Sequence, residues 1–185
     1  CEAISFAYLG KDEPRETEVS DERERAASNA HTFLGALSFV PGVDDDGKVD
    51  AKKLKAWISE ARRISERTGH RSMLDYKIGE LLAHAPMGED DAWPCEAVRE
   101  AVNDLYNSDM ARGITIGRYN SRGATWRGEG GAQERELANQ YEAWAVASEY
   151  DYPRMASVLR KMVENYNHEA EWQDNEAMIR RRMRF

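Results

Sequence analysis

The sequence lacks the features that most directly assign a protein to a class. Its two cysteines, Cys1 and Cys95, form no C-x-x-C pair and are too few for a disulfide framework. No apolar run approaches the roughly 18–20 residues that span a bilayer. The motifs G-x-S-x-G, H-E-x-x-H and G-x-x-x-x-G-K-[ST] are all missing. We therefore expect no membrane span, no catalytic residue, no cofactor and no resident metal.

An excess of basic charge is also missing, since 26 Lys and Arg stand against 34 Asp and Glu, for a net charge of −8. Such a chain lacks the overall field that draws proteins to nucleic acid or anionic lipid. No basic and apolar leader is present, so we expect a cytoplasmic protein with reduced thiols. The sequence begins at Cys1 instead of Met, which favours a domain excised from a larger chain.

Apolar residues at helical spacing dominate what is present. Two such stripes, within residues 133–166, meet at Asp151-Tyr152-Pro153, and proline suits the first turn of a helix. The second helix is expected to run to about residue 180. A short link between two amphipathic helices predicts an antiparallel hairpin. The stripe residues are Leu137, Tyr141, Trp144, Ala145 and Ser148 in the first helix, and Met155, Val158, Leu159, Met162, Val163 and Tyr166 in the second.

Similar stripes predict helices within residues 21–40, 50–68, 71–85, 94–105 and 108–117, and residues 1–9 are expected to be the end of a further helix. Asp50 and Ser108 are the expected N-caps of two of them, and Gly79 inside a helix indicates a close helix–helix approach or simple tolerance. We expect Trp57, Tyr141, Trp144 and Tyr166 to be core residues. The fold class predicted is all-α, with roughly seven helices packed as antiparallel hairpins in an irregular array or bundle.

We expect one all-helical domain over residues 1–185, and its parts follow from composition. An N-terminal helix and linker occupy 1–20, helical hairpins 21–120, a Gly-rich loop 121–131 and the C-terminal hairpin 132–185. Successive helix pairs are repeat-like in kind, but no sequence repeat of fixed period occurs.

Three patterns suggest metal binding. Asp44, Asp46 and Gly47 match positions of an EF-hand loop, but the same alignment puts Lys53 where a ligating carboxylate is needed. An acidic turn before the Asp50 N-cap is the favoured interpretation. The pairs Glu80/His84 and Glu164/His168 each share a helix face, although such spacings arise easily by chance in a Glu-rich chain.

Two basic segments are the candidate binding regions. In the 121–131 loop, Arg122 and Arg127 could bind an anion and Trp126 could stack on a ligand, but a mobile connecting loop is the favoured interpretation of the glycines. At the C-terminus, cations suit the negative end of a helix dipole, or they could contact nucleic acid. These C-terminal cations are Arg180, Arg181, Arg182 and Arg184.

Three stretches together carry a family resemblance: D-G-K-V-D with L-K-A-W (46–57), I-G-E-L-L-A-H-A-P with W-P-C-E-A-V-R (78–99), and Y-N-S-R-G with G-G-A-Q-E-R-E-L-A (119–138). The chain resembles the C-terminal helical region of large uncharacterised bacterial proteins. The resemblance implies a domain from a larger bacterial chain and no catalytic residues.

The leading functional hypothesis is a non-catalytic helical domain that binds another protein or other domains of a parent chain. Its contact regions would be the exposed face of the helical array and the 121–131 loop. The alternative is a nucleic-acid-binding accessory domain that uses the Arg-rich C-terminus with Arg122 and Arg127. A metal-dependent or enzymatic domain is the third hypothesis.

Overall fold

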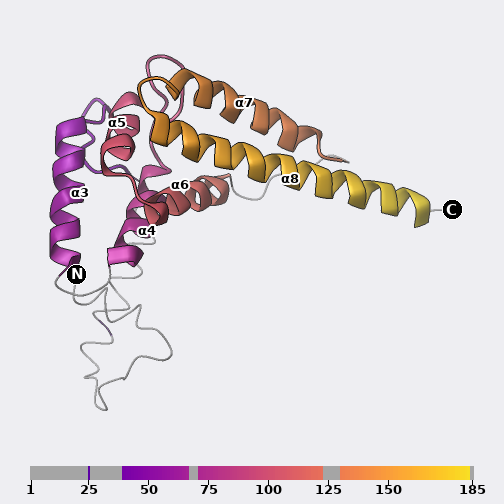
Figure 1. The fold of residues 1–185 in the computed structure, drawn as a ribbon, viewed down its shortest axis with the longest axis horizontal. Helices are drawn as coiled ribbons and strands as arrows, with labels where there is room; N and C mark the ends of the chain where they lie inside the picture. Colours follow the sequence, from indigo (N-terminus) through magenta and orange to yellow (C-terminus); the bar gives the residue numbers. More distant parts are fainter. Residues whose placement is uncertain (1–24, 26–38, 67–70, 123–129, 184–185) are drawn as a thin grey trace, which may run out of the picture.

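The protein is described here by a computed structural model that covers residue 25 and residues 39–66, 71–122 and 130–183. Within these ranges the chain is all-α, as predicted, with six helices and no strand (Figure 1). The expected helix in residues 1–9 lies outside of the described residues, as does that in 21–40 apart from residues 25, 39 and 40. In the described part of the chain, no helix combines the length and the apolar character that crossing a membrane requires.

The predicted C-terminal hairpin is present. Helix α7 (Ala132–Ser148) and helix α8 (Pro153–Met183) run side by side in opposite directions, as Figure 1 shows in orange and yellow. The turn between them is tight, because the Tyr152 N–H donates to Ser148 O at 2.8 Å. The second helix begins at Pro153 as expected and extends three residues beyond the predicted end. The predicted stripe residues are buried between the helices, apart from Leu137 and Val163 at the edge of the core.

Helix α4 (Arg71–Leu82) crosses helix α6 (Ser108–Ser121) at very short distance, and glycines make this possible. A Cβ atom on Gly79 would lie 2.2 Å from Met110 O, and one on Gly113 would lie 2.0 Å from Tyr76 O. Of the two explanations offered for Gly79, the close helix–helix approach is therefore confirmed.

Helix α3 (Ala51–Glu66) packs against α4 and against helix α5 (Glu96–Leu105). The prediction that Trp57 is a core residue was wrong, because this side chain is 40% exposed. The buried face of α3 is centred on Leu54, Ile58, Arg62 and Ser65 instead. Trp57 lies one residue, or about 100°, to the side of that line.

A buried ionic network joins α3, α4 and the start of α6. Asp75 is 2% exposed and accepts from Arg62 Nε at 2.6 Å, from Asn107 Nδ2 at 2.6 Å and from Arg71 Nε at 3.2 Å. Asn107 also accepts from the Met110 N–H at 2.8 Å, so it is the N-cap of α6. The prediction that Ser108 caps this helix was wrong by one residue.

Aromatic rings fill the core where α7 and α8 meet the loop before α5. Tyr141 stacks on Tyr166 at 5.4 Å and meets Trp93 and Trp144 edge-on. The three aromatic residues of α7 and α8 predicted for the core are thus buried there. This cluster joins α5, α7 and α8 into one apolar core, and it fixes the loop that borders the cleft described next.

Candidate functional site

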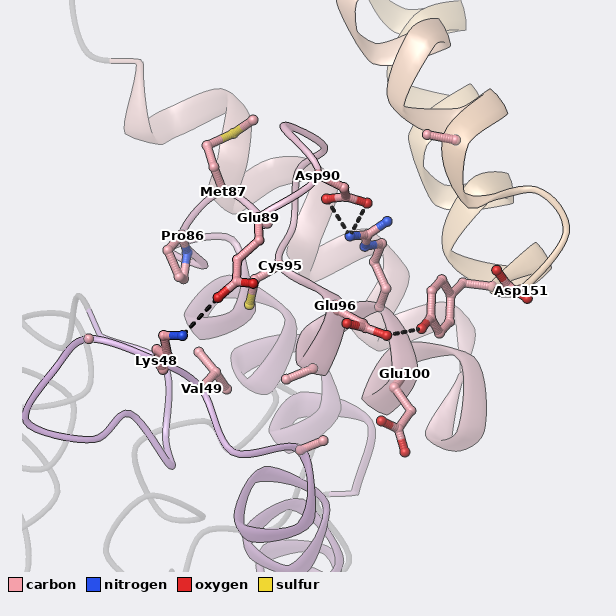
Figure 2. Close-up of a pocket in the computed structure, with 17 residues that line it drawn as sticks. Lys48, Val49, Pro86, Met87, Glu89, Asp90, Cys95, Glu96, Glu100 and Asp151 are labelled. Atoms are coloured by element: carbon pink, nitrogen blue, oxygen red, sulfur yellow. Dashed lines mark hydrogen bonds and ion pairs between the residues drawn. The ribbon is translucent and has the colours of Figure 1, made fainter.

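A cleft of about 680 Å³ lies where four segments of the chain meet (Figure 2). They are residues 47–51, residues 86–90, the start of α5, and the turn between α7 and α8. Apolar side chains contribute part of the lining: Val49, Pro86, Met87, Ala97 and Ala147. Charged side chains contribute the rest: Lys48, Glu89, Asp90, Glu96, Arg99, Glu100 and Asp151.

The first border of the cleft is the acidic turn predicted from the sequence. Asp44 Oδ1 accepts from the backbone N–H groups of Asp46 at 3.1 Å and Lys48 at 2.8 Å, which closes the turn on itself. Asp50 Oδ1 accepts from Lys52 and Lys53 N–H groups at 2.8 and 3.0 Å. The Asp50 N-cap is therefore confirmed. The Asp44 carboxylate is occupied in holding the backbone.

The second border of the cleft is formed by residues 83–95, whose backbone is hydrogen-bonded to side chains of the aromatic core. The Trp93 indole N–H donates to Ala85 O at 2.9 Å, and the Trp144 indole N–H donates to Asp91 O at 3.0 Å. The Cys95 N–H closes the loop through Pro86 O at 2.9 Å. Each end of the segment is thus tied to buried structure, so the side chains that line the cleft project from a fixed backbone.

Arg99 is the buried cation of the cleft. It is 3% exposed, donates from Nη2 to both carboxylate oxygens of Asp90 at 2.8 and 2.7 Å, and lies 5.5 Å from the Tyr152 ring. Its buried Nε has no hydrogen-bond partner among the described residues. Burial alone would raise the pKa of Asp90, but the hydrogen bonds from Arg99 and the Ala92 N–H outweigh it and lower that pKa.

The remaining charges make the cleft acidic. Five carboxylates line it against two cations, Lys48 and Arg99. Lys48 pairs with Glu89 at 2.8 Å, and Glu100 pairs with Lys55 at 2.6 Å. Glu96 accepts the Tyr152 hydroxyl at 3.0 Å, and Asp151 makes no side-chain hydrogen bond or ion pair with any described residue. Two carboxylates at the α5 and α7–α8 side are therefore not neutralised by a cation.

Cys95 lines the same cleft at the N-cap of α5 but is not prepared for nucleophilic chemistry. Burial raises the pKa of the Cys95 thiol, and this outweighs the lowering by nearby N–H groups and Arg99. The thiol is then protonated at neutral pH, whereas the thiolate is the reactive form. The arrangement favours binding over covalent catalysis.

A second surface lies at the far end of α8. Figure 1 shows this end extending past α7 and α6. Trp172, Ile179 and Met183 are 56, 54 and 74% exposed, and their spacing of i, i+7 and i+11 puts them on one face. Every residue from Met178 to Met183 is exposed. We call residues 172–183 the α8 tip.

The structure separates the predicted arginine sites. Arg122 follows α6 and lies 5.2 Å from the Tyr166 ring, whereas Arg180 lies fourteen residues further along α8, about 21 Å away along the axis. Arg180 pairs with Glu176 at 2.7 Å, and Arg182 is exposed. Arg181 is exposed as well. Trp126, Arg127 and Arg184 lie outside of the described residues.

In each of the two Glu/His pairs, the glutamate forms an ion pair with a neighbouring lysine. Glu80 accepts from Lys77 at 2.6 Å and Glu164 from Lys161 at 2.7 Å, while His84 and His168 are exposed. Within the ranges that the structure covers, no group of three or more His, Cys, Asp or Glu side chains is placed to hold a metal ion.

Sequence reasoning missed the cleft and its buried arginine. The cleft joins segments up to about a hundred residues apart in the chain, so no local pattern reveals it. A signal for Arg99 did exist, because an arginine stands between Val98 and Val102 inside the apolar stripe of α5.

Comparisons with protein-family models, with curated proteins and with solved structures find no match to this chain.

Proposed function

We propose that the chain is a non-catalytic all-α domain that binds another protein through the α8 tip. The carrying observation is the exposed apolar face of Trp172, Ile179 and Met183. Trp172 lies near the start of α7, since Asp174 accepts from the Gly131 N–H and from Arg135, and the last turns of α8 extend beyond α7 (Figure 1). Large exposed apolar side chains that share a face are typical of contact surfaces. Laying such a face into a groove is a common mode of helix recognition.

The arginines define the chemistry of the partner. Arg180 and Arg182 each lie one residue from the apolar face, on opposite sides of it, because consecutive residues are about 100° apart. The helix dipole explains cations in a last turn, but it does not explain the exposed tryptophan and isoleucine beside them. The partner that fits is a protein groove with an apolar floor and carboxylates along its rim.

The charge of the tip favours such a groove over a membrane surface. The same stretch carries Asp174 and Glu176, so its positive charge is confined to the last turn. Helices that lie on anionic lipid carry cations along the whole polar face. A protein groove can match a local cluster of charges, which a lipid surface cannot.

The test is capture from a nuclease-treated bacterial lysate with tagged protein. Wild type should retain a specific protein, and Trp172→Ala/Ile179→Ala should lose it. Trp57→Ala is the matched control, since it removes an exposed tryptophan from α3, and it should retain the protein. Equal capture by wild type and the tip variant would overturn the proposal.

The 121–131 loop stays a second predicted contact region, and Trp126→Ala/Arg127→Ala tests it in the same capture. Weaker capture without a loss of thermal stability would place the loop in the contact. The nucleic-acid alternative also stays a prediction. It requires capture that disappears with nuclease and binding that weakens steeply with salt.

A further inference from the structure

The cleft has the surface chemistry that the α8 tip requires. Its lining combines apolar side chains, among them the 46% exposed Met87, with carboxylates on several sides. Figure 2 shows Glu96 and Asp151 at the side of the cleft formed by α5 and the α7–α8 turn. Asp151 has no partner among the described residues, and Glu96 is bonded only to a hydroxyl group. Both carboxylates can accept a guanidinium group.

The tip cannot reach the cleft of its own chain. Asp151 and Tyr152 line the cleft immediately before α8 begins at Pro153, whereas Arg180 lies 27 residues further along the same helix. At 1.5 Å per residue the two are about 40 Å apart. Helix α8 is continuous from Pro153 to Met183, so it holds the complementary surfaces at opposite ends.

We propose that the α8 tip of one copy docks into the acidic cleft of a second copy. Arg180 and Arg182 pair with Glu96 and Asp151, and the apolar face of the tip covers Val49 and Met87. The inference rests on the proposed function, because it names the partner of the same tip. The contact joins two different surfaces, so it is heterologous and builds either a closed ring or an open chain.

The cleft also offers a donor to the incoming segment. Arg99 donates to Asp90 from Nη2 alone, and its buried Nε has no hydrogen-bond partner among the described residues. Glu176 lies one turn before Arg180 on the tip. The docked tip therefore brings both acidic and basic groups to a cleft that is itself lined by both. Cations are in excess in the last turn of the tip, and carboxylates are in excess in the cleft.

Sedimentation velocity of the purified chain over a range of concentrations tests this docking. Wild type should associate, with weaker association at high salt. Arg180→Glu/Arg182→Glu and Glu96→Arg/Asp151→Arg should each weaken self-association by about tenfold or more, since each removes charge-assisted hydrogen bonds. The chain with all four substitutions should associate again, because the charges are complementary once more. Arg154→Glu/Lys161→Glu, which alters two exposed cations of α8 outside the tip, is the control and should associate like wild type.

Two results would overturn the docking. One is a wild type that sediments as a monomer at every concentration. The other is association of both reversed variants to the same extent as wild type. If wild type is monomeric while Trp172→Ala/Ile179→Ala still loses a captured protein of different sequence, self-docking fails and the interaction domain stands. If neither assay responds to the tip, both proposals fail.

Discussion

Gly79 on α4 and Gly113 on α6 face each other at the helix crossing, and a Cβ atom on Gly113 would lie 2.9 Å from Gly79 Cα. Glycine normally weakens a helix by about 1 kcal/mol relative to alanine. Here the sign should reverse, because a methyl group on either residue meets backbone atoms that cannot move aside without separating the helices. Glycine thus lowers the helix propensity at this position but allows the two helices to pack closely.

Gly79→Ala should therefore lower the free energy of unfolding by about 1–3 kcal/mol, the usual cost of overpacking a core. Thermal unfolding followed by circular dichroism measures it. Ala143→Gly on the exposed face of α7 is the control, and it should cost only about 1 kcal/mol. A Gly79→Ala variant at least as stable as wild type would contradict the close crossing.

Asp75 holds three donors from three segments at a site that is 2% exposed. Asp75→Ala should lower the free energy of unfolding by about 3–5 kcal/mol, because it leaves the buried Arg62 cation without its carboxylate partner. Asp45→Ala, an exposed acid in the 42–50 turn, should stay within about 0.5 kcal/mol of wild type. Urea denaturation compares the two, and equal values for both variants would argue against the buried network.

Acid should destabilise the fold through carboxylates that the folded state keeps ionised. Hydrogen bonds from Arg135 and the Gly131 N–H lower the pKa of Asp174, and those from Lys53 and Lys52 N–H groups lower the pKa of Asp50. Their stabilisation is complete above the unfolded pKa of about 3.9. It is lost as the pH falls from there through the folded values, because the unfolded chain takes up protons first.

The midpoint of thermal unfolding should accordingly fall as the pH is lowered below about 4. Asp174→Asn should reduce that pH dependence while already lowering the midpoint at neutral pH. A midpoint that rises on acidification, or an Asp174→Asn variant with the full pH dependence of wild type, would contradict the assigned hydrogen bonds.

Cys95 should react slowly in the folded protein, because burial raises the pKa of its thiol and only the thiolate is nucleophilic. In a Cys1→Ser background, alkylation by iodoacetamide at neutral pH should be slower than that of glutathione. Unfolding in urea should accelerate it. Faster alkylation of the folded protein than of glutathione would indicate an activated thiol and revive an enzymatic role.

Apolar periodicity predicted the helices well because it reports which side of a helix is covered. It placed the α7–α8 hairpin, the start at Pro153 and the buried stripes of both helices. The turn chemistry of Asp50 was equally local, since its partners lie two and three residues away. The close approach at Gly79 was one of two open interpretations, and only the position of α6 decided it.

Features that depend on contacts between distant segments could not be predicted from the sequence. Apolar character suggested a buried Trp57, but the orientation of α3 is set by Ile58 and by Arg62, whose partner is on another helix. The cleft depends on four segments that meet only in the folded chain. The Arg-rich C-terminus was visible in the sequence, yet its extension beyond the fold follows from the positions of α6 and α7 (Figure 1).

Hydrogen–deuterium exchange of the full chain, free and in complex with the protein it captures, tests the central claim most directly. Amides of residues 178–183, the part of the α8 tip in which every residue is exposed, should exchange quickly in the free chain. Bound partner should slow their exchange, while the middle of α7 should exchange alike in both states. Slowed exchange confined to other segments, with residues 172–183 unchanged, would show that the α8 tip is not the contact element.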